Sequence, residues 1–212
     1  MATFEITLTQ FCNYLTKTSR QKATVARQIA TSLAEDYQAP VDYWLHLRNG
    51  VRRAISTTGR AESLDAMMDN VPVDRQGNYQ IMLDGLKRYW GNKTFDRITY
   101  RKAVWRHSRL KIRVSIELYG EYRNKVYLIK LYTHVNDSIR KDEADMMLLV
   151  MKEALQSEIQ RFEEEGHEVV LGVLDVAKGK LHSYREVGED VSTILKLEAE
   201  VLGKYLSEVM IP

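Results

Sequence analysis

The stretch RLKIRVSIEL, Arg109 to Leu118, alternates between two kinds of side chain almost without error. Aliphatic residues occupy one set of positions and charged or polar residues the other: Leu110, Ile112, Val114, Ile116 and Leu118 against Arg109, Lys111, Arg113, Ser115 and Glu117. A period of two residues is typical of a β-strand with one buried face and one face in water. The stretch therefore predicts a half-buried sheet whose outward face is basic.

Basic residues are concentrated around this stretch. Residues 84–130 carry 13 Lys or Arg and only 4 Asp or Glu. Like charges on neighbouring strands repel one another, and a polyanion would relieve that repulsion while releasing its own condensed counterions. The sequence therefore predicts that DNA or RNA contacts six cations on adjoining strands: Arg101, Lys102, Arg106, Arg109, Lys111 and Arg113.

Aromatic residues lie among these cations and indicate a second kind of contact. Tyr100 and Trp105, together with Tyr89 and Trp90, are expected to stack on exposed bases. Two structural interpretations compete with this one: Trp105 belongs to the core, and the arginines pair with an acidic helix. No helix-turn-helix, zinc or RNA-recognition signature supports nucleic-acid binding.

The C-terminal part of the chain has the opposite charge. Residues 131–212 carry 9 basic and 17 acidic side chains. If the fold keeps the two regions apart, the basic middle of one copy can meet the acidic tail of another. A non-catalytic protein that self-associates into a homo-oligomer is therefore the alternative function.

Helical patterns fill the first part of the chain. Thr7 or Thr9 is expected to cap a first helix, and a basic helix is expected over residues 19–34. Pro40 stands where a further helix is expected to begin. The last helix of this part, QIMLDGLKRYW, is expected to close at Gly91.

The pattern then changes to a period of two. The expected elements are strands over 100–107, 109–118 and 125–135, a helix over 138–165, a buried strand in HEVVLGVLDV, an edge strand in KGKLHSYR and a helix from Asp190. The sequence thus predicts an α+β fold, with a helical N-terminal half followed by an α-β-β-β-α-β core and a C-terminal helix. Residues 1–95 would form a helical region and 96–212 an α/β region with a mixed sheet, or the two would form one continuous domain.

The order of these elements resembles that of the PD-(D/E)XK nuclease-like fold. In that family an acidic residue ending the second strand, and an acidic-x-lysine triplet in the third, bind a divalent metal that activates water. The resemblance implies catalytic roles for Glu117 and Lys130, with Mg²⁺ or Mn²⁺ as cofactor. The triplet here is LIK, with leucine in place of the second carboxylate. The resemblance thus implies an inactive relative, or a site that recruits Asp175 or Glu121.

Lys130 and Asp175 also have ordinary structural interpretations. Lys130 has apolar neighbours on both faces of its strand, so its ammonium must emerge at a strand end, pair with an acid or lose its charge. The simplest of these outcomes is a lysine that reaches water at the sheet edge. Asp175 lies near the carboxyl end of a buried strand, where open α/β sheets place ligands. Its simplest role is to cap the next turn.

A second resemblance concerns two blocks, YQAPVDYWLHLR and YLIKLYTH. They are similar to blocks in an uncharacterised group of bacterial proteins of similar length. This resemblance spans most of the chain and implies no known function.

Several classes of protein and site are disfavoured by what the sequence lacks. The single cysteine, Cys12, cannot form an internal disulfide, which suits a cytoplasmic protein. The five histidines are dispersed, so no zinc site is expected. There is no Gly-rich phosphate loop, no signal peptide and no apolar run long enough for a membrane helix. Nucleic-acid binding is the leading prediction, self-association the alternative and metal-dependent nuclease activity the third, and no cofactor is expected outside the nuclease interpretation.

Overall fold

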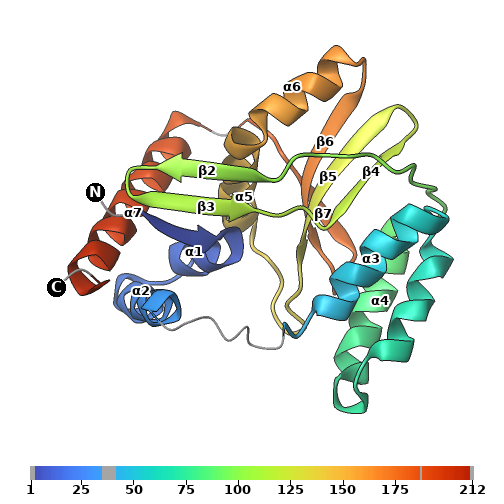
Figure 1. The fold of residues 1–212 in the computed structure, drawn as a ribbon, viewed down its shortest axis with the longest axis horizontal. Coiled ribbons are helices and arrows are strands. Elements are labelled where there is room, and N and C mark those ends of the chain that lie inside the picture. Colours follow the sequence, from blue (N-terminus) through green and yellow to red (C-terminus); the bar gives the residue numbers. More distant parts are fainter. Residues whose placement is uncertain (1–2, 35–41, 187, 211–212) are drawn as a thin grey trace.

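The computed structural model describes residues 3–34, 42–186 and 188–210 of the chain. It contains two β-sheets, one of three strands and one of four, with helices packed around them (Figure 1). This architecture confirms the predicted α+β class, the helical N-terminal half and the C-terminal helix.

The helical elements follow the order expected from the sequence, with two 3-10 helices between the third and fourth α-helices. Their bounds are α1 (Leu8–Leu15), α2 (Ser19–Ala34), α3 (Leu45–Thr57), η1 (Ala61–Asn70), η2 (Val73–Arg75), α4 (Gln76–Trp90), α5 (Lys141–Ala154), α6 (Gln156–Glu164) and α7 (Glu189–Met210). No helix in the described ranges is long and apolar enough to cross a membrane.

The four-stranded sheet forms the centre of the molecule. Its order is β4 (Leu118–Tyr122), β5 (Lys125–Tyr132), β6 (Glu168–Asp175) and β7 (Lys180–Ser183). β5 and β6 run parallel and the other neighbours run antiparallel, and α5 and α6 make the connection between the parallel pair. The sheet is therefore mixed, with β6 inside it and β7 at its edge, as the sequence predicts.

Alternate residues of β5 and β6 face two separate hydrophobic cores. Val126 and Leu128 belong to a first core that includes α1, α2, α5 and α7. Ile129 and Leu131 belong to a second core with α3, η1 and α4. Because both faces of these strands are covered, their sequences are apolar at nearly every position.

The three-stranded sheet has β3 (Leu110–Val114) in the middle, parallel to β1 (Phe4–Thr7) and antiparallel to β2 (Ala103–His107). Its inner face, with Trp105 and Ile112, is buried in the first core against α1 and α5. In the view of Figure 1, α5 lies behind β2 and β3, and α1 lies beside β1 and β3. The alternating stretch therefore has one buried face, as its period requires.

The predicted strand over 109–118 is divided between the two sheets. β3 ends at Val114 and β4 begins at Leu118, so residues 115–117 carry the chain from one sheet to the other. The hydroxyl of Tyr100 accepts a hydrogen bond from the Ile116 N–H and donates one to the Ile116 carbonyl, both at 3.0 Å. These bonds replace a strand partner for the backbone at Ile116. Ile116 stays fully buried, so the alternation of aliphatic and polar residues continues through the bend. The sequence pattern therefore does not reveal where one strand ends and the next begins.

Other boundaries also differ from those predicted. β1 was not expected, since four residues carry little periodic signal. The helix over 138–165 begins at Lys141 and divides at Leu155 into α5 and α6. The hairpin turn narrows to Arg123 and Asn124, which both have positive φ angles, of 52° and 60°. Pro40 lies outside the described residues.

Two predicted helix ends are confirmed. Thr7, rather than Thr9, caps α1, because its hydroxyl accepts a hydrogen bond from the Gln10 N–H at 3.1 Å. The Gln10 side chain accepts from the Thr7 N–H in return, which completes a capping box. Gly91 follows the last residue of α4 with a φ of 54°, a conformation that favours glycine.

Candidate functional site

Three cations lie on the outer face of the three-stranded sheet, and we call Arg106, Lys111 and Arg113 the basic face. Arg106 and Lys111 are directly opposite each other in the pairing of β2 with β3. Their chain neighbours Trp105 and Ile112 point to the opposite side, into the first core. Arg106 and Arg113 are exposed and Lys111 is half-buried. The alternation of the sequence thus places these positive charges toward water.

One acidic residue shares the basic face. Glu5 of β1 lies opposite Lys111, and its Oε1 is 3.2 Å from Nε of Arg113. The side chains of Arg113 and Glu5 keep 60% and 49% of their surface exposed. Ion pairs this exposed are worth little, so the pair can open at small cost. Glu5 was not predicted as a partner, because β1 was not expected from the sequence.

Arg109 lies apart from the basic face. It is half-buried against α7, where its guanidinium donates a hydrogen bond to the hydroxyl of Ser207. Gly203 of the same helix lies next to the Arg109 Cβ. Arg109 therefore holds α7 to the end of the sheet, and the structure does not bring it together with the three cations of the basic face.

Arg101 and Lys102 precede β2 and have exposed side chains. The backbone N–H of Arg101 donates to Oε2 of Glu158 in α6, at 3.2 Å. Glu158 also accepts from Arg161 of its own helix, at 2.9 Å. Arg161 thus pairs with the acids Glu158 and Glu165 of its own helix, and Arg113 pairs with Glu5 of β1 rather than with the acidic helix.

The prediction that bases stack on Trp90 and Trp105 was wrong. Trp90 is fully buried and Trp105 is 4% exposed. The indole of Trp90 donates to the Gly59 carbonyl at 2.9 Å, and that of Trp105 donates to Oε2 of Glu153 at 2.6 Å. Both rings are core residues with satisfied N–H groups, and neither presents a free surface.

Three further cations extend the positive surface beyond the sheet. Arg52 and Arg53 of α3, with Arg97, line a shallow recess of about 240 Å³ beside Tyr119. The ring of Tyr119 packs on Tyr100 at a centroid distance of 4.8 Å, next to the end of β3. Sequence reasoning missed these residues, because contact between α3 and the strands is long-range.

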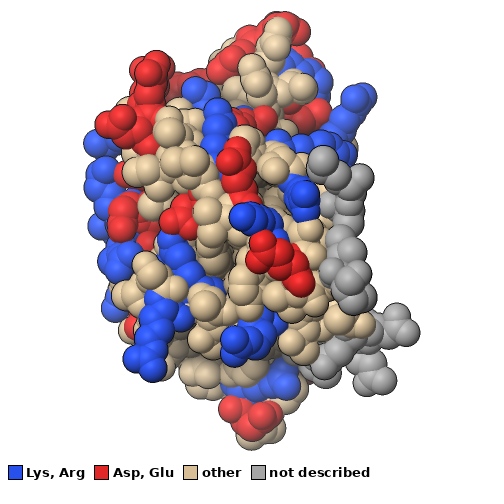
Figure 2. Space-filling model, turned by 90° about the vertical axis from the view of Figure 1, so that its left-hand side faces the viewer, with Lys and Arg blue, Asp and Glu red and all other residues tan. Residues whose placement is uncertain are grey.

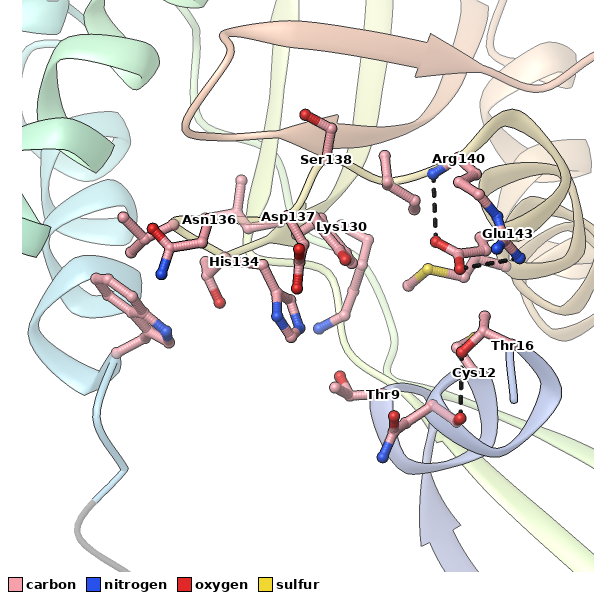
Figure 3. A pocket seen from close by; sticks show the side chains of 18 of the residues that line it. Thr9, Cys12, Thr16, Lys130, His134, Asn136, Asp137, Ser138, Arg140 and Glu143 are labelled. Atoms are coloured by element: carbon pink, nitrogen blue, oxygen red, sulfur yellow. Dashed lines mark hydrogen bonds and ion pairs between the residues drawn. The ribbon is translucent and has the colours of Figure 1, made fainter. Parts of the chain in front are cut away.

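A larger cleft of about 750 Å³ opens at the carboxyl end of β5 (Figure 3). Its walls come from α1, the starts of α3, α4 and α5, and the loop that follows β5. Thr9, Cys12 and Thr16 line it from α1, and His134 and Asn136 line it from the loop. Carboxyl ends of parallel strands are the usual place for ligands in α/β sheets.

Glu117 and Lys130 meet at this cleft as a buried ion pair. Nζ of Lys130 is 2.7 Å from Oε1 of Glu117, and the two residues are 7% and 1% exposed. Oε1 also accepts from the Ser115 hydroxyl at 3.2 Å, and Oε2 accepts from the Leu131 N–H at 3.0 Å. The lysine therefore pairs with an acid, one of the outcomes open from the sequence, and the carboxylate is held from two sides.

Asp175 does not join this pair. It lies opposite Tyr132 in the pairing of β5 with β6, and it is not part of the cleft wall. Its Oδ1 accepts a hydrogen bond from the Lys178 N–H at 3.3 Å, across the turn that follows β6. Glu121 lies at the other end of β4, close to His167. The structure thus brings together two of the three predicted catalytic residues, and Asp175 caps a turn.

The surroundings of the Glu117 carboxylate do not suit a divalent cation. Both carboxylate oxygens accept hydrogen bonds, and the Lys130 ammonium occupies the position beside them. Leu128, in the place of the second carboxylate, is buried in the first core. The described residues contain no group of three His, Cys, Asp or Glu able to hold a metal. The residues of this site therefore do not fit Mg²⁺ or Mn²⁺.

Burial decides the chemistry of two other groups at the cleft. Desolvation raises the pKa of the Cys12 thiol well above its ordinary value, so the thiol stays protonated and is a poor nucleophile. Desolvation, helped by the charge of Glu143, raises the pKa of Tyr132 to about 12. Neither group supplies a base or a nucleophile at neutral pH.

Comparisons with protein families, curated proteins and solved structures found no match to this chain.

Proposed function

We propose that this protein binds nucleic acid, either DNA or RNA, through the basic face of its three-stranded sheet. The observation that carries the proposal is the position of Arg106 beside Lys111 on a sheet face that no helix of the described chain covers. Arg113 on the same face, and Arg101 and Lys102 just before β2, add exposed positive charge.

The basic face holds like charges close together. Arg106 and Lys111 face each other across two antiparallel strands, where like charges destabilise the pairing. A phosphate backbone placed over this pair removes the repulsion and releases counterions to the solvent, which favours binding at low salt. Because the tryptophans near the sheet are buried, we expect contacts mainly to phosphates and little preference for sequence.

The test is the salt dependence of binding to a labelled single-stranded oligonucleotide, measured by fluorescence anisotropy. We expect affinity to fall steeply between about 50 and 200 mM salt. Changing Arg106→Gln together with Lys111→Gln should weaken binding and lower the slope of log affinity against log salt by about 1.4, from two lost phosphate contacts.

The matched control removes two lysines from another surface. Lys196→Gln with Lys204→Gln changes the net charge of the protein by the same amount, at exposed positions on α7. This control should leave affinity and slope near those of the wild type. Equal losses in the two double variants, or binding that ignores salt, would refute the proposal.

A second candidate, self-association, is favoured by one observation on α7. Ile194, Leu197 and Val201 are spaced along one side of this helix and are 50%, 55% and 58% exposed. Basic and acidic side chains are interspersed over the face of the molecule that carries α7 (Figure 2). An apolar stripe of this kind marks surfaces that meet other proteins. Light scattering should show a dimer for the wild type and a monomer for Leu197→Glu. A monomeric wild type would exclude self-association.

A further inference from the structure

We infer that the cleft at the carboxyl end of β5 binds a nucleoside, that is, a heteroaromatic base on a pentose, either free or within a strand. This inference is independent of the basic face, because a free nucleoside carries no phosphate. It depends on the balance of charge in the cleft, its hydroxyl and amide groups, one aromatic wall and the unused donor of Lys130.

Most charges in the cleft wall are compensated within the protein, and the two other charged residues of the wall, Lys17 and Asp137, are opposite in sign. Lys130 pairs with Glu117 at 2.7 Å, and the Arg140 guanidinium is 3.3 Å from the Glu143 carboxylate. Arg48 forms an ion pair with Asp42. Since these charges are already neutralised, the cleft has little attraction for a phosphate or a metal ion. A neutral polar ligand can replace its lost hydration with hydrogen bonds to the cleft wall.

Hydroxyl and amide side chains supply most of the remaining polar surface. Thr9 and Thr16 lie on the α1 side, and Asn136 and Ser138 lie on the loop side (Figure 3). Hydroxyls and amides both donate and accept hydrogen bonds. Bases and pentoses present both kinds of group along their edges, so this lining matches the polar edges of a nucleoside.

Trp44 provides the aromatic wall. It is half-buried at the start of α3 and lines the cleft. Tyr43 packs edge-on against its ring at 4.7 Å, and Tyr79 lies at 5.0 Å. These contacts fix the indole while leaving part of it accessible. Stacking on such a ring tolerates any base, because every base has an aromatic face.

Lys130 supplies a directed donor at the floor of the cleft. Its ammonium has three protons; one is given to Glu117 at 2.7 Å and a second to the Ser115 hydroxyl at 3.5 Å. The described residues provide no third acceptor, and the ammonium points into the cleft (Figure 3). A carbonyl or ring nitrogen of a base would complete its hydrogen bonding. The cleft volume of about 750 Å³ lies in the range of sites for small organic ligands.

Intrinsic tryptophan fluorescence gives a direct readout, because Trp44 differs from the other two tryptophans. Trp90 is 0% exposed and Trp105 is 4% exposed, so an added nucleoside can reach only Trp44. We expect adenosine, guanosine, cytidine or uridine to quench the emission with a saturable curve. The absence of saturable quenching by all four nucleosides, and of any binding in calorimetry, would overturn the inference.

Two variants locate the binding. Trp44→Leu and Asn136→Ala should each raise the calorimetric Kd for the nucleoside by about tenfold. Asn136 is exposed, so its removal does not threaten the fold. Asn92→Ala, also exposed but outside the cleft, is the matched control and should leave Kd unchanged. A nucleoside Kd that none of these variants changes would place the ligand elsewhere and contradict the inference.

An oligonucleotide distinguishes the two sources of the nucleoside. Quenching of Trp44 by both adenosine and a short oligoadenylate assigns the cleft to a base within a strand, and quenching by adenosine alone assigns it to a free nucleoside. The Arg106→Gln/Lys111→Gln variant should keep its adenosine affinity while losing salt-dependent oligonucleotide binding. Adenosine binding without salt-dependent binding in the wild type would reject the basic face and leave the cleft site standing, whereas the reverse result would reject the cleft alone.

Discussion

At the scale of single residues, the buried ion pair between Glu117 and Lys130 is the central contact of the cleft at the carboxyl end of β5. Sequence reasoning placed both residues on neighbouring strands and noted that an ammonium among apolar neighbours needs a partner. The structure supplies that partner at 2.7 Å, together with the Leu131 N–H as a second donor to the carboxylate. Removing either charge leaves the other buried without compensation.

We therefore predict a large and non-additive effect on stability. Lys130→Met should lower the free energy of unfolding by about 3 to 5 kcal/mol, as measured by urea denaturation, because Glu117 loses its counter-charge. The double variant Glu117→Leu/Lys130→Met should recover most of this loss. Lys125→Met is the control: Lys125, also on β5, pairs in water with Glu168 of β6, and its loss should change little. Additive losses in the double variant would contradict the interpretation.

The buried thiol of Cys12 leads us to predict how the stability of the fold depends on pH. Burial raises the pKa of its thiol, so the folded state keeps the proton that the unfolded state loses above about pH 8.5. The unfolded state then binds fewer protons, so stability should fall as pH rises from about 8.5 to 10, by up to about 1.4 kcal/mol per pH unit. Urea denaturation at several pH values should show this slope, and Cys12→Ala should flatten it. An unchanged slope in the variant would rule out the thiol as its cause.

At the scale of elements, periodicity predicted most of the helices and strands, and long-range pairing produced the differences. β1 forms because it pairs with β3, about a hundred residues further along the chain, and no local pattern announces that partner. The division of residues 109–118 at Ile116 also could not be predicted from the sequence. Ile116 stays buried at the bend, so the alternation of buried and exposed residues is not interrupted there. The candidate site follows the same rule: Glu117 and Lys130 were predicted, but Trp44 and Thr9 reach the cleft only through tertiary packing.

Packing of α4 against the central sheet gives a prediction at this scale. A Cβ added at Gly85 would lie 1.7 Å from the Val176 carbonyl oxygen, so Gly85→Ala must push the helix away from the end of β6. We expect it to destabilise the protein by about 1 to 3 kcal/mol or more in thermal unfolding. Gly77→Ala, in the first turn of the same helix, meets nothing within 4 Å and should stabilise by at most about 1 kcal/mol. A harmless Gly85→Ala would contradict the close approach of α4 to the sheet.

At the scale of the whole molecule, segregation of charge along the sequence does not become segregation in space. Acids of the C-terminal part reach back to the basic part, where Glu153 accepts from Trp105 and Glu200 lies 3.1 Å from His107. Seen from the side of α7, both signs of charge are mixed (Figure 2). This mixing weakens the idea of a basic middle docking on an acidic tail. The outer face of the three-stranded sheet, with Arg106 and Lys111, keeps its positive character.

Mapping of backbone amide shifts by NMR, during titration with a single-stranded oligonucleotide at low salt, tests the binding surface most directly. We expect the shift changes to concentrate in β2 and β3 and in the residues just before β2, and to disappear as salt is added. Shift changes confined to α7, or no changes at low salt, would contradict this expectation.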